Sequence, residues 1–349
     1  MATIPAPTAS TSTGRKSSAS RPAFPSSKGR KARALVATAL SLAAVTAAGA
    51  AAIAATSSSA QAAVITNVVA SPAKYGYPDA TNAGVPAATA LKTVPAQVSS
   101  GTGWSYDAAA NKVVVTGNGA VLSGLSITGN LEIDASNVTV KNVKVTTSGN
   151  YGIDLRHTSN VTIQNSTVSG LNATTGRLNY AVDDVYGDST GMVISGNDIS
   201  NFRTAVAMSN GTATRNYIHA PGFIAGDHTN GFYANGGTPG HALTIANNTI
   251  LNGLGQTDAI NLDAGSPGIP TGNITVKNNL LAGGAYALYG GNVLGNATSH
   301  IVVQGNRFAQ SYYPKSGLYG PVAYFDSAGH GNSWSGNVWD STGKAVPAA

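Results

Sequence analysis

A six-residue pattern of apolar and small residues recurs along most of the chain. An apolar residue opens each copy, a small or amide residue usually stands third, Asn is frequent at the fourth place, and an apolar residue closes it. The nine copies occupy residues 122–127, 140–145, 163–168, 194–199, 213–218, 245–250, 276–281, 303–308 and 334–339. Successive copies start 18 to 32 residues apart, which is typical of the coils of a solenoid.

Each copy predicts two short strands around a tight corner. The Gly or Asn at the third place can adopt the left-handed backbone conformation that such a corner requires. The fourth place holds Asn197, Asn216, Asn248, Asn279, Asn306 and Asn337. Stacked from coil to coil, these amides can bond to one another and form an asparagine ladder. Because no strong helix pattern follows the N-terminal region, we predict an all-β chain, a single right-handed parallel β-helix over residues 113–340.

A second strand follows most copies after a loop, with an apolar residue at its second place. Alternation directs that apolar residue inward and the third and fifth residues outward. The third place holds Asp154, Asp183, Ala207, Tyr233, Asn261 and Tyr289, and the fifth holds Arg156, Val185, Ser209, Asn235, Asp263 and Gly291. Parallel strands lie about 4.8 Å apart, so we expect Asp154 and Asp183 to be neighbours on a solvent-facing row.

The formal charge of +6 belongs mostly to the N-terminal region. Residues 1–63 hold seven Lys and Arg and no acidic residue, which leaves 13 basic against 14 acidic residues in the remainder. A chain so close to neutral lacks the basic surface that nucleic-acid binding needs. The basic stretch, the Ala-rich apolar run and the Ala60-Gln61-Ala62 triplet predict a signal peptide over residues 1–62, and therefore a secreted protein that leaves the membrane after cleavage.

The regions outside the repeat are predicted to close the solenoid. Residues 63–112 form an N-terminal segment that we expect to cap the first coils, and residues 341–349 form a C-terminal tail. The chain has no Cys, so its stability must come from the coils themselves rather than from disulfides.

The repeat, the outward row and the export signal together resemble the pectate-lyase-like superfamily of β-helix proteins, particularly those secreted by actinobacteria. The resemblance covers nearly the whole mature chain and implies a fold that carries lyases, hydrolases, epimerases and adhesins. Asp183-Asp184 and Gly329-His330-Gly331 echo motifs of polygalacturonase-like hydrolases, but the second lies about five coils away without an R-x-K partner. The stretch at residues 226–231 has the Asp-His pair of a lyase without its arginine motif.

Two cleavage reactions fit the side chains of the outward row. Hydrolysis needs a carboxylic acid and a carboxylate, and elimination from a uronate needs a cation beside the sugar carboxylate together with a base. The candidate catalytic residues are Asp183, His228, Asp154, Arg156 and Asp227. The candidate substrate-binding residues are Tyr233, Asn235, Asn261, Asp263, Tyr289, Arg177 and Arg203, and Asp154, Asp183 and Asp184 could hold Ca²⁺.

We therefore expect a secreted, monomeric carbohydrate-active enzyme whose partner is a polysaccharide. A lyase acting on an acidic, uronate-containing glycan stands slightly ahead of a glycoside hydrolase that uses paired Asp carboxylates. A noncatalytic glycan-binding or adhesion β-helix remains the alternative of a different class.

Overall fold

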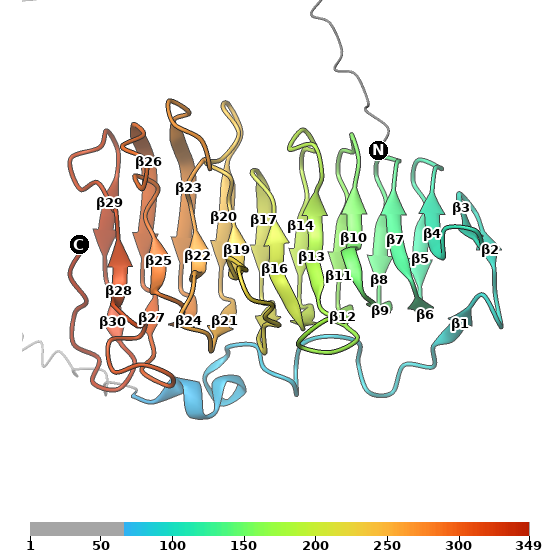
Figure 1. Ribbon diagram of the computed structural model, residues 1–349, viewed down its shortest axis with the longest axis horizontal. Coiled ribbons are helices and arrows are strands. Elements are labelled where there is room, and N and C mark those ends of the chain that lie inside the picture. Colours follow the sequence, from blue (N-terminus) through green and yellow to red (C-terminus); the bar gives the residue numbers. More distant parts are fainter. Residues whose placement is uncertain (1–65, 349) are drawn as a thin grey trace, which may run out of the picture. The chain divides into compact units, whose positions relative to one another are not determined.

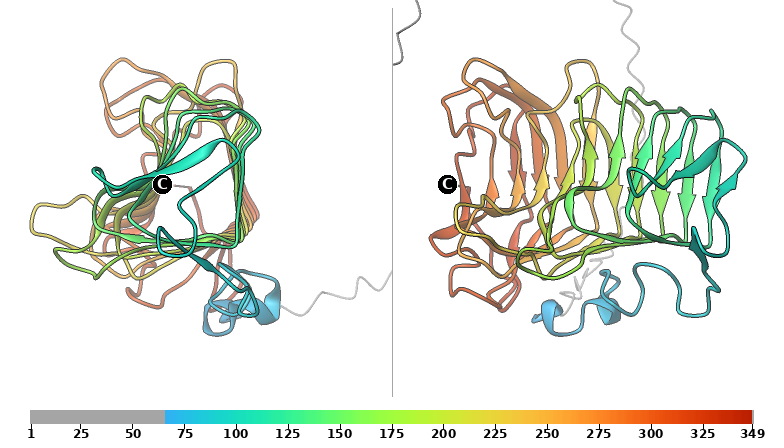
Figure 2. Two further views of the ribbon diagram at one scale, coloured as in Figure 1. Left: turned by 90° about the vertical axis from the view of Figure 1, so that its right-hand side faces the viewer. Right: turned by 45° about the vertical axis from the view of Figure 1, so that its right-hand side comes forward.

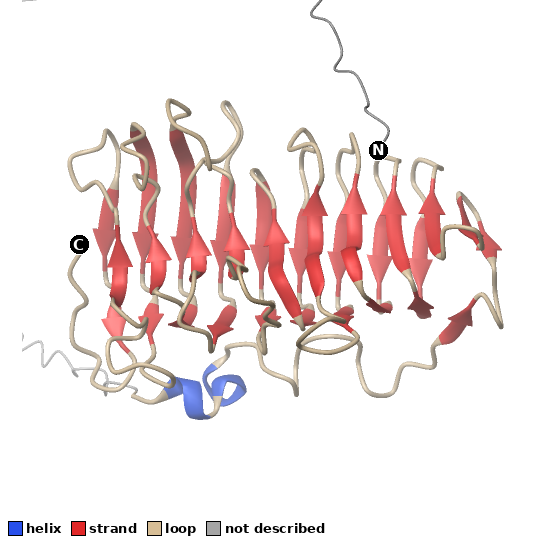
Figure 3. Cartoon of the chain, in the orientation of Figure 1, coloured by secondary structure: helices blue, strands red, loops and turns tan. Residues whose placement is uncertain are grey.

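Three sheets wind around a common interior and form a right-handed parallel β-helix, with antiparallel pairs only at the first strands of one sheet (Figures 1 and 2). The computed structural model describes residues 66–348, so the expected signal peptide lies outside the described residues. Strands joined by loops make up nearly all of this part of the chain (Figure 3). No helix within residues 66–348 is long and apolar enough to cross a membrane. The predicted fold class is confirmed.

The three walls of the solenoid are called sheets A, B and C. Sheet A contains β1 (Lys92–Val94), β6 (Leu125–Thr128), β9 (Lys144–Thr147), β12 (Thr167–Gly170), β15 (Asp198–Ser200), β18 (Tyr217–Ile218), β21 (Thr249–Asn252), β24 (Leu280–Gly283), β27 (Arg307–Phe308) and β30 (Val338–Trp339). Sheet B contains β2 (Ser100–Gly101), β3 (Trp104–Asp107), β4 (Lys112–Val115), β7 (Asn130–Ile133), β10 (Gly149–Leu155), β13 (Leu178–Asp184), β16 (Phe202–Ala207), β19 (Asn230–Tyr233), β22 (Asp258–Asn261), β25 (Tyr286–Tyr289) and β28 (Gly320–Ala323). Sheet C contains β5 (Val121–Ser123), β8 (Thr139–Lys141), β11 (Thr162–Gln164), β14 (Val193–Ser195), β17 (Gly211–Thr214), β20 (Leu243–Ala246), β23 (Thr271–Lys277), β26 (Thr298–Gln304) and β29 (Ser333–Ser335).

The six-residue repeat forms the corner between sheets C and A. Its third residue has a positive φ in all nine copies, from 47° at Asn165 to 67° at Gly305, and Arg215 is the one that is neither Gly nor Asn. The fourth residue is buried from Asn197 to Asn337. From Asn197 to Asn306, each amide Nδ2 donates to the Oδ1 of the next Asn at 2.9–3.0 Å, which confirms the asparagine ladder.

Inward apolar residues from all three sheets fill the solenoid. Val140, Ile163 and Ile194 stack on sheet C, and Val145 and Val168 stack on sheet A, each at most 1% exposed. Every coil therefore buries its core against the coils before and after it, and the outer face of sheet B is free to carry chemistry.

Residues 66–91, here called the N-terminal strap, differ from the predicted cap. The strap contains two short 3₁₀ helices, η1 (Val68–Ala70) and η2 (Pro72–Tyr75), and runs along sheet A from the last coils towards β1 (Figure 1). Val68 packs against Leu280, and the Val68 and Val69 backbone N–H groups donate to the Asp340 carboxylate. The expectation that this segment covers the first coils was wrong for its beginning, which lies on the last coils. The sheets themselves begin before residue 113, because β1 joins sheet A.

The C-terminal tail covers the open end of the last coil. The Trp334 indole Nε1 donates to the Val346 carbonyl at 2.7 Å, and the Val346 N–H donates to the Asn337 carbonyl. Val346 is 2% exposed, so the tail closes the core at this end.

Candidate functional site

The strands of sheet B bend near their middle, where small residues stand in register. A side chain at Gly152 would collide with its surroundings, since a Cβ there would lie 2.7 Å from Val168 Cγ1. Two rows of larger side chains flank this bend. One row is Tyr151, Tyr180, Thr204, Asn230 and Asp258, and the other is Glu132, Asp154, Asp183, Ala207, Tyr233, Asn261 and Tyr289.

Asp154 and Asp183 are direct neighbours in this register, as the sequence predicts. Their exposure is not as predicted, because Asp154 is fully buried and Asp183 is 8% exposed. Neighbouring side chains of the two rows cover them, which strand alternation alone does not reveal. The row is a partly buried acidic seam rather than a fully solvated face.

The Asp183 carboxyl group lines a cavity on the outer face. The cavity has a volume of about 300 Å³, and Tyr151, Tyr180 and Tyr233 also line it. Burial, with additional repulsion from Asp184 and Asp154, raises the pKa of Asp183 to about 7, although Arg203 opposes the shift. No side chain or backbone group within residues 66–348 hydrogen-bonds to this carboxyl group. Near neutral pH it can therefore both give and accept a proton.

Asp154 sits instead in a chain of ion pairs beneath the outer face. Its carboxylate accepts hydrogen bonds from the Arg156 Nε at 2.8 Å and from the Asn130 Nδ2 at 2.7 Å. Arg156 also pairs with Glu132 at 3.2 Å, and Glu132 pairs with Lys112 at 2.7 Å. Two cations and two anions alternate along this chain, so it is neutral as a whole. Glu132 and Lys112 are missing from the sequence-based candidates because β7 and β4 precede the first strand of the outward row recognised there.

Asp184 both lines the cavity and stabilises a turn. Its carboxylate accepts the Ser189 backbone N–H at 3.3 Å and so holds the turn that follows β13. Burial raises the pKa of Asp184, and the hydrogen bonds from Ser189 oppose the rise.

The three acidic residues proposed as calcium ligands do not converge on one point. Asp154 is occupied by Arg156 and Asn130, and Asp184 by Ser189. Within residues 66–348 no group of three or more His, Cys, Asp or Glu side chains is placed to hold a metal ion. This donor set does not fit Ca²⁺, which takes six to eight oxygen ligands, and we derive no step through a metal.

Tyrosine rings form the walls of the cavity. Tyr151 and Tyr180 stack with their centroids 6.1 Å apart, and the Arg203 guanidinium lies 4.9 Å from the Tyr180 centroid on the other side. Tyr233 donates a long hydrogen bond of 3.4 Å to the Asn235 Oδ1. Flat aromatic faces beside hydrogen-bonding groups suit sugar rings, whose faces are apolar and whose edges carry hydroxyls.

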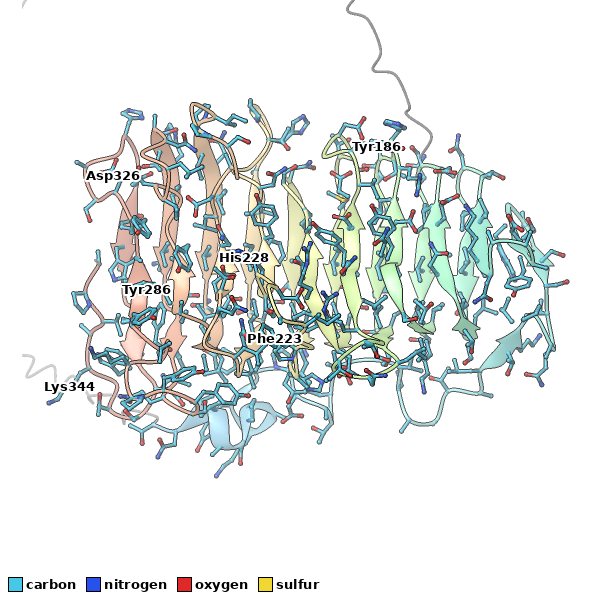
Figure 4. All side chains as sticks on the ribbon, viewed as in Figure 1. Tyr186, Phe223, His228, Tyr286, Asp326 and Lys344 are labelled. Carbon is cyan, nitrogen blue, oxygen red and sulfur yellow. The ribbon has the colours of Figure 1, made fainter. Side chains whose placement is uncertain are left out.

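The turn after β13 forms the rim of the cavity. The Tyr186 ring lies parallel to the His157 imidazole at 4.2 Å, and His157 Nδ1 lies 2.6 Å from an Asp188 carboxylate oxygen. Figure 4 shows Tyr186 at the upper edge of the coils, where the strands of sheet B end. This clamp between two coils holds the rim in place.

Arg177 and Asp227 form an ion pair with each other, and neither residue lines the cavity. The Arg177 Nε and Nη2 donate to the two Asp227 carboxylate oxygens at 2.6 and 2.5 Å, and both side chains are at most 8% exposed. The pair joins the loop before β13 to the loop before β19. Its groups are used in this bidentate contact, which leaves neither available for the catalytic or substrate-binding role expected of it.

His228 lies at the opposite end of sheet B from Asp183. It precedes β19, whereas the register partner of Asp183 two strands away is Tyr233, the last residue of β19. Its side chain is exposed and lies well below Tyr186 in Figure 4. The structure therefore separates His228 from the acidic pair with which the sequence grouped it.

The remaining candidates lie along the later coils of sheet B. Asn261 donates to Asp258 at 3.2 Å, and Asp263 accepts the Val293 N–H at 2.9 Å. Burial raises the pKa of Tyr289 to about 12, with further contributions from Asp258 and the neighbouring tyrosines. Tyr289 lies four strands from Asp183, so these residues flank the cavity at a distance.

The sequence reasoning missed Tyr151, Tyr180 and Tyr186. The first two stand two places before the apolar residue of their strands, on a side that strict alternation assigns to the interior. The bend at the small residues reverses this assignment. A small residue recurring next to the inward apolar position is the signal that could have revealed them.

One family model matches this chain. The model described as "Right handed beta helix region" matches residues 123–308, which is more than half of the chain. No curated relative and no solved structure matches the chain in the same comparisons. The matched residues include β6 to β27 and all the acidic residues of the cavity. The chain belongs to the right-handed β-helix family.

Proposed function

We propose that this protein is a secreted carbohydrate-active enzyme that cleaves a polysaccharide on the outer face of sheet B, with Asp183 as its acid–base residue. One observation carries the proposal: a carboxyl group without a hydrogen-bond partner lines a cavity walled by tyrosines and has a pKa of about 7. Strongly shifted carboxyl groups in clefts are typical of acid–base catalysts.

Hydrolysis of a glycosidic bond is the reaction that this cavity supports best. Protonated Asp183 would donate its proton to the leaving oxygen, and Asp184, the other carboxylate of the cavity, would activate water or stabilise the positive charge on the sugar. Asp154 is fully buried, so we assign it the role of a positioning residue whose negative charge helps to keep Asp183 protonated. From the sequence a lyase stood slightly ahead, but among residues 66–348 no Lys or Arg side chain lines the cavity to neutralise a uronate.

Elimination is the second candidate, and Arg203 favours it. Its guanidinium stacks on Tyr180 and acts electrostatically on Asp183, so it is the cation best placed to meet a uronate carboxylate near the cavity. Ionised Asp183 would then remove the α-proton. Noncatalytic glycan binding on the same tyrosines is the alternative of a different class.

A panel of neutral and uronate polysaccharides distinguishes these functions. We expect the mature protein to release reducing ends without an unsaturated product, with or without chelator. Asp183→Asn should lose at least about 100-fold in rate, the usual contribution of an acid–base group. The matched control is Asp134→Asn, which removes an exposed carboxylate of the same face outside the cavity.

Each other outcome rejects a particular part of the proposal. An unsaturated product would replace hydrolysis by elimination. Full activity of Asp183→Asn would remove Asp183 from the mechanism. Glycan binding without any cleavage on a broad panel would favour the noncatalytic alternative.

A further inference from the structure

A second cavity adjoins the Asp183 cavity on the outer face of sheet B. It has a volume of about 280 Å³ and shares Tyr151 with the first cavity, so the tyrosine ring stands between the two. Its other lining residues carry amide, hydroxyl or methyl groups and no charge. They are Ala110, Asn111, Asn130, Thr147, Ser148 and Asn150.

Each amide of this cavity is fixed at one end and free at the other. The Asn111 Oδ1 accepts the Tyr106 hydroxyl at 2.8 Å, and the Asn150 Oδ1 accepts the Asn179 Nδ2 at 2.7 Å. The Asn130 Nδ2 donates to Asp154 at 2.7 Å. Within the described residues, the Nδ2 groups of Asn111 and Asn150 and the Oδ1 of Asn130 have no partner. Two donors and one acceptor, already oriented, are thus available to a ligand.

The surroundings of the second cavity are electrically balanced. Lys112, Glu132, Asp154 and Arg156 pair with one another, so these four described side chains leave no net charge beside the cavity. Asn130 belongs both to the cavity and to this chain, since it holds Asp154, the strand neighbour of Asp183. A ligand that touches Asn130 would therefore contact the group that supports the acid.

We propose that the second cavity binds an uncharged stretch of the glycan whose reacting bond lies at Asp183. This inference rests on the proposed function and specifies its substrate class, a neutral polysaccharide long enough to extend past Tyr151. Sugar hydroxyls both donate and accept, which matches the two free donors and the free acceptor. A uronate chain would bring carboxylates to a surface whose nearby cations, Lys112 and Arg156, are already paired with Glu132 and Asp154.

Binding measured with the full mature protein carrying Asp183→Asn tests the inference without turnover. The probes are oligosaccharides from disaccharide to octasaccharide derived from cellulose, xylan, mannan and galactan, with oligogalacturonates for comparison. We expect one neutral series to bind more tightly as it lengthens. Adding Asn150→Ala should weaken the long oligomers about three- to ten-fold, the effect of one lost hydrogen bond, and leave the short ones unchanged.

Two further variants complete the design. Ser148→Trp should abolish the gain with length, because its ring would fill the cavity from an exposed position. Gln164→Ala removes an amide from sheet C and should change nothing. The inference is overturned if oligogalacturonates bind best, if no neutral series binds, or if neither cavity variant alters the gain with length. The proposed function is judged separately, by the loss of cleavage in Asp183→Asn.

Discussion

At the scale of single residues, Asp183 combines burial with the absence of a hydrogen-bond partner. Such a carboxyl group disfavours its own ionisation, and the folded protein therefore loses stability when the pH forces a charge upon it. Burial also raises the pKa of Asp154, but the hydrogen bonds from Arg156 and Asn130 oppose that rise. The two neighbours thus differ in their hydrogen-bond partners. This difference suits Asp183 to transfer a proton and Asp154 to hold a fixed position.

Asp183→Asn should stabilise the protein at alkaline pH. The folded pKa of about 7 lies above the usual aspartate value of 3.8, so the folded state binds the proton more tightly than the unfolded state. The loss in free energy of unfolding that Asp183 causes is absent below pH 3.8, grows between pH 3.8 and 7, and reaches its full size above pH 7. Removing it should raise the free energy of unfolding at pH 8 by roughly 2–4 kcal/mol. Denaturant unfolding at pH 4 and pH 8 measures this, and an equal effect at both pH values would contradict it.

Asp154→Asn should lower the pKa of Asp183. The substitution removes one of the two negative charges that disfavour ionisation of Asp183 and keeps an amide that Asn130 can still contact. Because the proposed acid works only when protonated, the alkaline limb of kcat/KM should move to lower pH. A pH–rate profile tests this. An unchanged limb with reduced activity would show that Asp154 serves the structure alone.

Sequence patterns could place Asp154 beside Asp183 but could not reveal how they differ. The alternation of apolar and polar residues and the length of the repeat were enough to predict the strand register, because parallel strands in stacked coils align their apolar residues. The burial of both carboxyl groups depends on side chains of other coils, among them Tyr151 and Asn130. The separation of His228 from the acidic pair depends on which end of β19 its loop enters.

At the scale of structural elements, the corner between sheets C and A is the most regular feature. The amides of the asparagine ladder pair with backbone N–H and carbonyl groups of the buried turns. Without these amides, those buried backbone groups would lack hydrogen-bond partners. The ladder was predictable from sequence because one residue type recurs at one place. The junction of the loops before β13 and β19 was not predictable, since it depends on contacts between residues about 50 positions apart, the Arg177–Asp227 ion pair and the hydrogen bond from the Phe223 N–H to the Ala173 carbonyl.

Asn248→Ala should destabilise the protein by about 2–4 kcal/mol. The Asn248 Oδ1 accepts both the N–H and the Nδ2 of Asn216, and its own Nδ2 donates to Asn279, so the substitution leaves several buried groups unpaired. Asn337 is the last asparagine of the ladder, and its Nδ2 donates to no further asparagine. Asn337→Ala should therefore reduce the free energy of unfolding by less than Asn248→Ala. Thermal unfolding compares the two. Equal losses would argue that the amides act independently.

Removing one partner of the Arg177–Asp227 pair should cost about 3–5 kcal/mol, because it strands a buried charge. Asp227→Leu is therefore expected to unfold earlier and to be cut by proteases near residue 225. The double variant Arg177→Met with Asp227→Leu should recover most of the stability. If the double variant is stable but inactive on a polysaccharide that the wild type cleaves, the pair has a role in function after all.

At the scale of the whole molecule, the N-terminal strap connects coils that the solenoid keeps apart. In an ordinary repeat protein each coil contacts only its neighbouring coils, so the two ends can unfold independently. Here Asp340 in the last coil accepts N–H groups of Val68 and Val69, and the same segment continues into β1 on sheet A. No periodicity marks residues 66–91, which explains why the sequence misplaced them.

Asp340→Ala should release the strap from the last coils. The carboxylate also pairs with Arg307 at 2.7 Å, so the substitution removes several contacts at one point. We expect faster hydrogen exchange in β24, β27 and β30 with little change in β7 and β10. The matched control is Asp326→Ala, an acidic residue of a late loop away from the strap. Uniform exchange across all coils would contradict a local role for the strap.

The strap also has a kinetic consequence. Most contacts between coils join residues about 20 to 35 positions apart, whereas the hydrogen bond between Val68 and Asp340 spans 272 positions. Chain closure over such a distance is slow and costs more entropy than closing one coil. The first described residues to leave the ribosome are therefore expected to dock among the last. A chain that has lost its final coil could still wind its early ones, yet its beginning would have no place to bind.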